Sequence, residues 1–481
     1  MPLKPAKQLI VFAGFMTLSL ILRFFSFFPT LISHDEGTYF VIAREIFQGK
    51  IYFADLVDTK PIGLFLILGL FIKYVSSSIF MIRMFTAAIV AFTAYVIYKI
   101  SLRDRGEQKP AIAAGIIYIF FVSVWAHFGV FINPELFYLL FTALAFYIFI
   151  RTDKPQGFFL LGLLLGFGFI LKYVVLFDLA AWLLFYFITI LMQRNRKASW
   201  KAFFNSAIAC IAIMIPFGLT VLYYYRVDHL QELWFYSFGV TSRIPVERTF
   251  GQLIIFIGDF HLRFLPLLFF FYYALARMKC KPEKPLLSIR FFGVWCLMVL
   301  LAVILPGKPF GHYFIQLMLP ISIVAGGFFS DYLAKPRWIR SVISYPVGPF
   351  IMILLVSGLL ILQKRDYYNK PDTPKEVAGY LRSLLKPGDR IYTGNYQQVL
   401  YYLLEKDCPV KYVHRTLMCD QEHQRTLQVD LPKEMNALMA MDFRFILMEE
   451  QYCYEPINEF IRENYRLIKE FPGEVFVYEK K

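Results

Sequence analysis

Charged residues are scarce in this chain of 481 residues: Asp, Glu, Lys and Arg make up 18% of it, against 58% hydrophobic and 19% aromatic residues. So little charge excludes an ordinary soluble globular protein, in which about a quarter of the residues are charged. The apolar residues do not alternate with polar ones, which excludes a membrane barrel. They form continuous runs, several of about 20 residues, which is the length of a spanning helix. The sequence therefore predicts a multi-pass α-helical membrane protein.

Several familiar motifs are also missing. The six cysteines include no Cys-x-x-Cys pair, so neither a structural zinc site nor a redox motif is indicated. Phosphate-loop and dinucleotide fingerprints are absent from the polar C-terminal segment, which therefore offers no independent chemistry. No repeat and no pair of matching halves suggests the symmetry of many transporters. Cys408, Cys419 and Cys453 are expected to include one disulfide if their segment lies outside the cytosol.

Acidic residues are the minority upstream of the C-terminal segment. Residues 1–363 hold 32 Lys and Arg against 16 Asp and Glu, whereas residues 364–481 hold 18 against 19. The net charge of +15 could indicate nucleic acid, but its position between apolar runs is what the positive-inside rule predicts for cytoplasmic loops. The charge therefore reports membrane topology.

About eleven spanning helices are predicted, with eleven to thirteen as the range. A cytoplasmic N-terminus then puts all five basic loops on the inner side and the C-terminal segment in the periplasm, with the chain in the inner membrane. The predicted spans are residues 8–29, 79–100, 111–126, 134–150, 157–172, 174–192, 203–225, 252–276, 291–305, 312–330 and 341–363.

Two domains are predicted: a transmembrane module at 1–363 and a soluble periplasmic α/β domain at 364–481. The apolar segment 60–75 is only marginally long and would turn every later basic loop outward if it spanned, so it is expected to be re-entrant or to lie on the surface. The periplasmic loop 30–78 then becomes long. Strands are predicted in "DRIYTGN", "PVKYV", "FRFILMEE" and "EVFVYEK", and helices in "QQVLYYLLEKD" and "EPINEFIRENYRLIKE".

Two adjacent carboxylates, Asp35 and Glu36, follow the first apolar run in "SHDEGTYF". They either mark the exit of the helix into water or form a site where a carboxylate touches both water and a lipid-borne substrate. The sequence that follows favours a site: "DEGTYFVIAREIFQGKIYFADLVDTKPIGLF" combines acids, aromatic residues and a Lys-Pro pair before an apolar segment.

The order of these residues resembles the first periplasmic loop of the GT-C glycosyltransferases related to the lipid A aminoarabinose transferase and the protein O-mannosyltransferases. The likeness continues in "NPELF", "GFGFILKYVV" and "GHYFIQLMLP" and covers roughly residues 8–330. It implies a GT-C fold and a sugar donor linked to a polyprenyl phosphate. It also implies that Asp35 is the base or acceptor-orienting group, that Glu36 supports it, and that Lys60 holds the donor phosphate.

Other cations are candidates for the same phosphate. Lys172 lies between two apolar runs on the predicted outer side, where it is either a snorkelling anchor or a second phosphate contact. Arg243, Arg248 and Lys308 lie in or near outer loops. Arginine suits bidentate phosphate binding, and a contact with lipid headgroups is the alternative for each.

Glu135 in "INPEL" matches an acidic position of the family, although some relatives carry an aspartate nearer the position of Asn133. It either positions the acceptor, completes a divalent-metal site or is a helix N-terminal acid. No closely spaced ligand set requires a metal, so a divalent ion stays open. The remaining candidates for substrate binding are Tyr39, Asp58, His312 and Tyr313.

These observations predict an inverting inner-membrane glycosyltransferase that moves a sugar from a polyprenyl-phosphate carrier to a periplasmic acceptor. The acceptor is a protein, lipid A or an envelope glycan, and the C-terminal domain is expected to help select it. The expected partners are the lipid-linked donor, the bilayer and that acceptor, and nucleic acid is not among them. A lipid-linked sugar flippase or transporter and a non-catalytic membrane scaffold are the alternatives.

Overall fold

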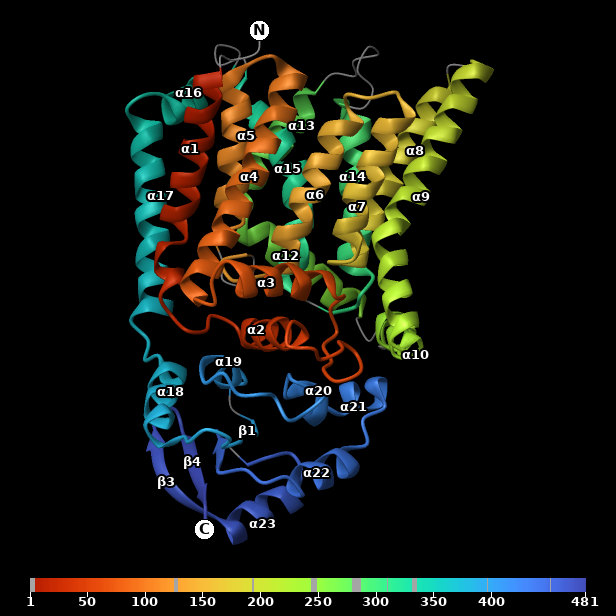
Figure 1. The fold of residues 1–481 in the computed structure, drawn as a ribbon. Coiled ribbons are helices and arrows are strands. Elements are labelled where there is room, and N and C mark those ends of the chain that lie inside the picture. Colours follow the sequence, from red (N-terminus) through yellow and green to blue (C-terminus); the bar gives the residue numbers. More distant parts are fainter. Residues whose placement is uncertain are drawn as a thin grey trace. The chain divides into compact units, whose positions relative to one another are not determined.

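The structure, a computed structural model, is predominantly helical (Figure 1). Contacts divide the chain into two compact units, each built from three separate segments. Unit 1 comprises Met1–Phe27, Arg83–Thr220 and Pro245–Arg365, and unit 2 comprises Phe28–Ile82, Val221–Ile244 and Asp366–Lys481. The described residues are 5–124, 129–192, 194–243, 249–278, 287–308, 310–330, 335–395, 397–449 and 451–481.

Unit 1 is a bundle of apolar helices. Two of its helices extend into unit 2, α4 with its first residues and α9 with its last. The elements are α1 (Pro5–Leu22), η1 (Phe24–Phe27), α4 (Ile79–Arg105), α5 (Gln108–Phe121), α6 (Pro134–Phe149), α7 (Pro155–Phe169), η3 (Tyr173–Val175), α8 (Leu176–Met192), α9 (Arg196–Arg226), α12 (Phe250–Arg263), α13 (Leu265–Arg277), α14 (Ile289–Ile304), η6 (Gly311–Leu317), α15 (Met318–Ala325), η7 (Gly326–Phe329), α16 (Arg337–Ile343) and α17 (Val347–Gln363).

Each of the eleven predicted spans coincides with one or more of these helices. Six described segments are both long and apolar enough to cross a bilayer, or seven if the bent pair α12–α13 is one span. The helices α5, α6, α7 and α14 are apolar but shorter, with 14 to 16 residues each. The chain is thus a multi-pass membrane protein by its helices, and the count of eleven spans stays a prediction.

The stretch 252–276, predicted as one span, is broken. Helices α12 and α13 meet at an angle of 91° beside Phe264. Pro266 occupies the first turn of α13, where it lacks an N–H and disfavours a helical conformation of the residue before it. Hydropathy alone did not reveal the break, because the two helices taken together are still apolar enough to pass as one span.

Small residues let neighbouring helices of unit 1 approach closely. A Cβ atom added to Gly162 of α7 would lie 2.5 Å from the carbonyl oxygen of Ala209 in α9, and one on Gly166 would lie 2.6 Å from that of Ile213. This is the small-xxx-small pattern by which membrane helices pack backbone to backbone. The α7–α9 contact therefore depends on both glycines.

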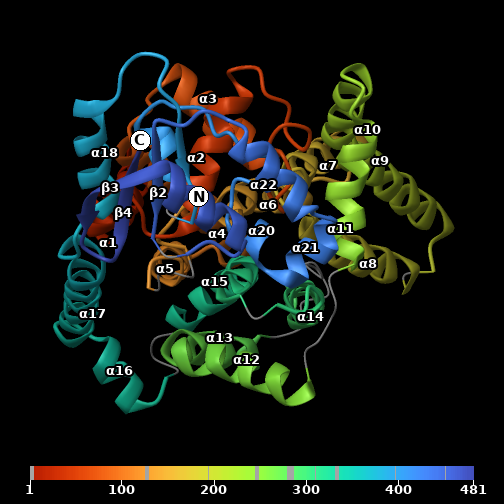
Figure 2. The ribbon, with the colours of Figure 1, turned by 90° about the horizontal axis from the view of Figure 1, so that it is seen from below.

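Unit 2 joins the loop region after the first helix to the C-terminal segment. Its sheet has the order β1-β2-β4-β3, and Figure 2 shows β4 between β2 and β3. The elements are α2 (His34–Ile46), α3 (Gly63–Tyr74), α10 (Leu230–Trp234), η4 (Phe235–Gly239), α11 (Val240–Arg243), η9 (Lys364–Tyr368), α18 (Thr373–Leu384), β1 (Ile391–Thr393), α19 (Val399–Leu403), α20 (Thr416–Cys419), α21 (Gln421–Leu427), α22 (Leu431–Met439), β2 (Phe445–Met448), α23 (Glu455–Asn464), β3 (Tyr465–Phe471) and β4 (Val475–Lys480).

The sheet is mixed: β1 pairs with β2 in parallel, and β4 pairs antiparallel with both β2 and β3. Three of the four predicted strands are present. Two predictions were wrong. "PVKYV" forms only an isolated bridge, between Tyr412 and Val57, and residues 465–471, predicted as the end of a helix, form β3. The hairpin with β4 overrides the helical pattern there, because it satisfies the backbone groups of both strands.

Contacts group the loop region 30–78 with the C-terminal segment, whereas the sequence grouped it with the transmembrane helices. The backbone N–H of Val57 donates to the carbonyl of Lys411 at 2.7 Å, and the Thr38 hydroxyl accepts from Gln398 at 2.6 Å. Helix α3 has 12 residues, or about 18 Å of helix, which is too short to cross hydrocarbon about 30 Å thick. A disulfide joins Cys419 to Cys453, and Cys408 is free and buried.

Candidate active site

The first turn of α2 holds the adjacent carboxylates Asp35 and Glu36. The Ser33 hydroxyl caps the helix by accepting from the N–H of Asp35 at 3.4 Å, and the Glu36 carboxylate reaches back to the N–H of Ile32 at 3.1 Å. Ser-x-x-Glu has the sequence pattern of a capping box, but here Glu36 accepts from the residue before the N-cap; the positive end of the helix dipole favours both acids. Helix capping thus explains Glu36, whose side chain is buried, but leaves Asp35 exposed by 31%.

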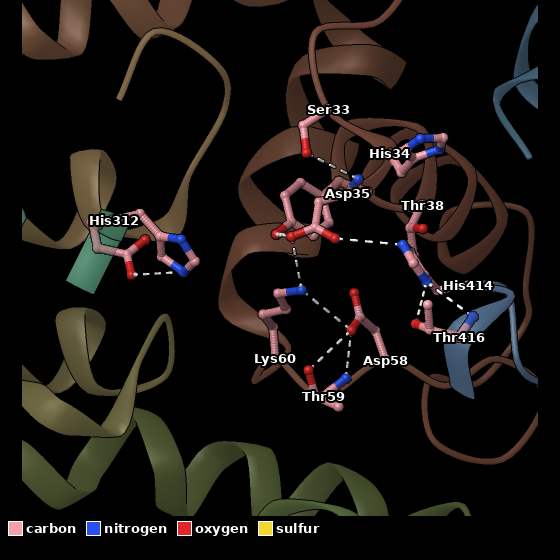
Figure 3. Close-up of polar contacts among 12 residues, drawn as sticks. Ser33, His34, Asp35, Thr38, Asp58, Thr59, Lys60, His312, His414 and Thr416 are labelled. Carbon is pink, nitrogen blue, oxygen red and sulfur yellow. Dashed lines mark hydrogen bonds and ion pairs between the residues drawn. The ribbon is translucent and has the colours of Figure 1, made fainter. Parts of the chain in front are cut away.

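Asp35 is the centre of a cluster drawn from three parts of unit 2 (Figure 3). Its Oδ2 atom lies 3.4 Å from Lys60 Nζ and accepts from the Tyr39 hydroxyl at 3.3 Å. Its Oδ1 atom lies 3.6 Å from His414 Nε2. We call these residues, together with Asp58, the Asp35 cluster. Asp35 and Lys60, predicted from the sequence to converge, are therefore neighbours.

Lys60 lies between two carboxylates. Its ammonium is 3.4 Å from Asp35 and 3.5 Å from Asp58 Oδ1, and it lies 5.1 Å from the centre of the Tyr39 ring. The Tyr52 hydroxyl donates to the carbonyls of both Asp58 and Lys60, at 3.0 and 2.6 Å, and so fixes the turn between them. This turn orients Lys60 toward the end of α2.

The hydrogen bonds of His414 determine its tautomer. The backbone N–H of Thr416 donates to His414 Nδ1 at 3.3 Å, so Nδ1 is an acceptor and, in the neutral ring, the proton is on Nε2. Nε2 faces Asp35 and can donate to it. Burial lowers the pKa of His414 below its usual value, although the carboxylates of Asp35 and Asp58 oppose the shift.

The charges of the cluster are set by its two carboxylates. Burial of the ammonium would lower the pKa of Lys60, but Asp35 and Asp58 outweigh it and raise this pKa well above its usual value. Burial, reinforced by Asp35, raises the pKa of Tyr39 well above its usual value, so its hydroxyl stays a donor. At neutral pH the cluster therefore presents one cation, two carboxylates and two neutral donors side by side.

A second group of predicted residues meets in unit 1. Lys172 Nζ pairs with Glu135 Oε1 and lies 4.0 Å from the centre of the Tyr313 ring. His312 Nε2, drawn in Figure 3, is 3.9 Å from the same Glu135 oxygen. Glu135 is buried in the first turn of α6, and η6 carries His312 and Tyr313. All four residues, predicted separately, thus form one cluster, which we call the Glu135 cluster.

Two polar atoms beside this cluster make no hydrogen bond to any described residue. They are Glu135 Oε2 and the side-chain nitrogen of Asn133, both buried. A buried polar group without a partner costs about 1–3 kcal/mol. One acceptor and one donor near the start of α6 are therefore available to a ligand with hydroxyl groups.

A buried network holds the segments that carry the Glu135 cluster. Asp178 accepts from Trp295 Nε1 at 2.6 Å and from Gln316 Nε2 at 2.7 Å. The same Gln316 amide donates to the carbonyl of Val174 at 3.2 Å. Because Gln316 belongs to η6 and Val174 follows Lys172, this network fixes His312 and Lys172 relative to each other.

The remaining residues predicted to bind phosphate belong to neither cluster, and one of them lies outside the described residues. Arg243 is exposed at the end of α11, with its guanidinium 5.2 Å from the centre of the Phe235 ring. Lys308 lies three residues before η6, and Arg248 is outside the described residues. The roles of Arg243 and Lys308 in phosphate binding stay predictions. Among the described residues, no group of three His, Cys, Asp or Glu side chains is arranged to hold a metal ion.

Sequence reasoning missed His414. It lies 379 residues after Asp35, in a segment without any recognised motif. The only local signal was its position in "KYVHRT", directly after a predicted strand, where side chains that serve a site often lie. Only the packing of that segment against α2 identifies it.

Comparisons with known proteins agree with this fold. The profile of the dolichyl-phosphate-mannose-protein mannosyltransferase family matches residues 59–219. No protein among those with curated functions matches the chain. Among solved structures, that of ArnT from Cupriavidus metallidurans bound to undecaprenyl phosphate is similar with a TM-score of 0.70 at 12% identity, over 99% of this chain and 98% of that chain.

A second solved structure is similar at lower score. The archaeal oligosaccharyltransferase AglB from Archaeoglobus fulgidus, in complex with an inhibitory peptide and a dolichol-phosphate, gives a TM-score of 0.52 at 11% identity, over 98% of this chain and 74% of that chain. At such identities the likeness is one of fold. The chain therefore shares its fold with ArnT, as the resemblance seen in the sequence led us to expect.

Proposed function

We propose that this chain, whose fold is similar to that of ArnT, is a GT-C glycosyltransferase that transfers a sugar from a polyprenyl-phosphate donor to a hydroxyl of its acceptor, with inversion at the anomeric carbon. The family profile over residues 59–219 and the polyprenyl phosphates bound by ArnT and AglB support this donor class. The observation that carries the proposal is the 3.4 Å approach of Lys60 Nζ to Asp35 Oδ2. It supports the proposal, because an ammonium and a carboxylate this close together could both reach one glycosyl-phosphate bond.

The reaction is a single displacement. The acceptor oxygen attacks the anomeric carbon, the bond from that carbon to the phosphate oxygen breaks, and its electron pair stays on the phosphate. Asp35 accepts the acceptor proton as the new bond forms, and Lys60 stabilises the charge that grows on the leaving phosphate. One displacement inverts the anomeric configuration.

The neighbours of Asp35 keep its carboxylate oriented. His414 and Tyr39 approach different oxygens, so the plane of the carboxylate is fixed from two sides. Lys60 pairs with both carboxylates in the resting site, and a donor phosphate would draw it away from Asp35. Asp35 would then lose one stabilising partner and become a better proton acceptor. Glu36 serves as a positioning residue through its bond to the N–H of Ile32.

The Glu135 cluster has its own proposed role in binding substrate. The unpartnered Glu135 Oε2 and Asn133 Nδ2 atoms can bind sugar or acceptor hydroxyls, and Lys172 offers a cation to a phosphate. His312 and Tyr313 would line this position. We also propose that carboxylates of the Asp35 and Glu135 clusters bind a divalent ion. Measuring the transfer activity with and without EDTA tests this.

The acceptor is proposed to be a protein, lipid A or an envelope glycan. The site is proposed to face the periplasm from the inner membrane, with the N-terminus in the cytoplasm, because the basic loops then lie inside. With this orientation the Cys419–Cys453 disulfide lies in the periplasm, which is an oxidising compartment where disulfides persist.

The test incubates the purified full-length protein with a panel of polyprenyl-phosphate sugars and envelope extracts, and identifies the glycosylated product by mass spectrometry. Asp35→Asn removes the proton acceptor but keeps the shape of the side chain. We expect it to lower the rate of transfer by about 100-fold or more. Asp407→Asn, the same change at an exposed position of unit 2, is the matched control.

Full activity of Asp35→Asn would refute the proposal, as would the absence of any product across the panel. Movement of lipid-linked sugar across a bilayer without glycosyl transfer would instead favour a transporter. Normal envelope glycans in cells that carry only Asp35→Asn would favour a scaffold.

A further inference from the structure

A cavity in unit 1 has no part in the proposed reaction. It has a volume of 320 Å³ and is lined by residues from the ends of α4 and α13 and from η7 and the segment before α16. Its charged residues are Arg105, Arg277 and Lys335, with Asp104 and Glu107. We call it the Arg105 cavity. Cavities of about this size hold small ligands or headgroups.

The three cations come from three separate basic loops. In the sequence each one is sufficiently explained by the positive-inside rule, which requires no contact among them. The fold brings all three to one cavity, at the last residues of α4 and α13 and two residues before α16. Convergence of this kind is not a consequence of topology.

Arg105 is built into the wall of the cavity. A Cβ atom on Gly327 would lie 2.5 Å from its Nη1 atom and 2.6 Å from its Cζ and Nη2 atoms, so the guanidinium packs directly against this glycine and would have to move if a side chain stood there. The side chain is 15% exposed. Its Nε and Nη2 atoms are buried and make no hydrogen bond to any residue in the described part of the chain. Two donor nitrogen atoms are therefore left for an acceptor, at a cost of about 1–3 kcal/mol each when unfilled.

The other two cations are held in place by aromatic rings. Lys335, only 5% exposed, has its ammonium 5.4 Å from the centre of the Phe328 ring and donates to the carbonyl of Ser330. The Arg277 guanidinium lies 5.0 Å from the centre of the Tyr273 ring. A buried lysine and an oriented arginine beside Arg105 make a set of donors suited to phosphate oxygens.

The acidic residues limit the charge of the ligand. Asp104 Oδ2 lies 3.8 Å from Arg105 Nε, and Glu107 also lines the cavity. Among the described residues that line the cavity, three cations and two carboxylates leave a net charge of one positive unit. A group with one negative charge matches this balance, whereas a nucleotide or a pyrophosphate would be repelled by the carboxylates.

We propose that the Arg105 cavity binds a phosphate group of single negative charge, the chemistry shared by a phospholipid headgroup and free dihydrogen phosphate. Basic pockets between membrane helices commonly hold phospholipid headgroups. Arg105 and Arg277 bind its oxygens, and Lys335 supplies the buried charge. Such a ligand would tie α4, α13 and η7 together.

The experiment uses the full-length protein in detergent, stripped of lipid. Its thermal midpoint is measured against short-chain phosphatidylglycerol in one arm and inorganic phosphate in the other, and native mass spectrometry of unstripped protein counts retained phospholipids. The variants are Arg105→Gln and Arg277→Gln, the second at an exposed side chain that leaves the core intact. Arg196→Gln, at the exposed start of α9, is the matched control.

We expect the ligand to raise the thermal midpoint of the wild type. The ligand concentration that gives half of this rise should be about tenfold higher in Arg105→Gln and Arg277→Gln and unchanged in Arg196→Gln. Stabilisation by phosphatidylglycerol with a retained phospholipid identifies a lipid as the source. Stabilisation by inorganic phosphate alone identifies a soluble ion. No stabilisation in either arm, or an equal loss in Arg196→Gln, would overturn the proposal.

Discussion

Lys60 keeps its charge although its side chain is only 23% exposed. Asp35 and Asp58 outweigh burial and raise its pKa, so the ammonium persists to a pH above that of an ordinary lysine. The stabilisation from this cation is therefore complete at neutral pH and is lost only as the pH rises through the raised pKa. Within the physiological range Lys60 is a permanent cation.

Replacing Lys60 by Gln should remove the charge that stabilises the leaving phosphate. We expect kcat/KM for the lipid-linked donor to fall by about 100-fold or more, since an electrostatic contact of this kind is typically worth 100- to 1000-fold. Lys60→Arg keeps the cation and should recover part of the activity. Steady-state kinetics with varied donor measure both, and equal rates for Lys60→Gln and the wild type would contradict a phosphate contact.

His414 gives the site a dependence on acid pH. Because burial lowers its pKa, the unfolded chain takes up a proton at this residue near pH 6.5 while the folded chain does so only at lower pH. Stability of unit 2 is thus complete above about pH 6.5 and declines as the pH falls toward the lowered pKa. Protonation would also add a charge beside Asp35 and weaken it as a base.

His414→Gln retains a neutral N–H donor but does not titrate. We expect activity to fall by about tenfold or less at pH 7.5, with the acidic limb of the pH profile moving to lower pH. The measurement is kcat/KM between pH 4.5 and 8, with His423→Gln, outside the Asp35 cluster, as control. An unchanged acidic limb in His414→Gln would show that His414 does not act on Asp35.

At the scale of elements, α2 is placed by its contact with α19. A Cβ atom on Gly37 would lie 3.2 Å from both the backbone nitrogen and the Cβ of Val399, so the two helices meet where α2 has no side chain. The Arg44 guanidinium donates to the carbonyl of Tyr401 at 2.8 Å and adds a second contact between them. The position of Asp35 thus depends on α19, which lies more than 350 residues later.

Gly37→Val should force α2 and α19 apart. We expect unit 2 to lose about 1–3 kcal/mol of stability through overpacking, and transfer to fall because Asp35 moves relative to Lys60 and His414. Gly379→Val is the matched control, because Gly379 lies in α18 with no atom within 4 Å of its Cβ position. Thermal unfolding and transfer rates report both effects, and equal results for the two variants would refute the close contact.

At the scale of the whole molecule, unit 2 cannot be separated from the membrane part by one cut. Its three segments interleave with those of unit 1, and residues 28–82 pack with residues 366–481 inside it. Lys50, for example, donates to the carbonyl of Cys408 at 2.9 Å and pairs with Glu45 at 2.6 Å. The C-terminal segment is therefore structural support for α2 as well as a candidate for acceptor selection.

Deletion of residues 371–481 should abolish transfer altogether. It removes His414 and α19, so α2 and the segment around Val57 lose their packing partners. We expect amide hydrogen exchange to rise throughout α2 in the truncated protein, with donor binding lost as well. If amide exchange in α2 stayed normal and the truncated protein still bound the donor, residues 371–481 would not support α2, and acceptor selection would be their remaining proposed role.

The sequence by itself determined the class of the protein and most of its helices. Hydropathy sufficed because a bilayer requires about 20 apolar residues per crossing, and basic loops marked one face. It also brought Asp35 and Lys60 forward, because both belong to one run that resembles a known family; the structure places them 3.4 Å apart, and their catalytic roles stay predictions. It failed where several signals compete: at the break beside Phe264 and at β3, where tertiary pairing overrides local pattern.

Only the tertiary structure decided which distant residues meet. Close contacts between residues hundreds of positions apart leave no trace in hydropathy or local spacing, because they depend on which segments pack together, as where Gly37 meets the backbone of Val399 and Gly327 meets the Arg105 guanidinium. This is why His414 joins Asp35, and why three loop cations that topology explains one by one share the Arg105 cavity. The order of residues determines the local chemistry of a segment. Which distant residues become neighbours follows from the close packing of the folded chain.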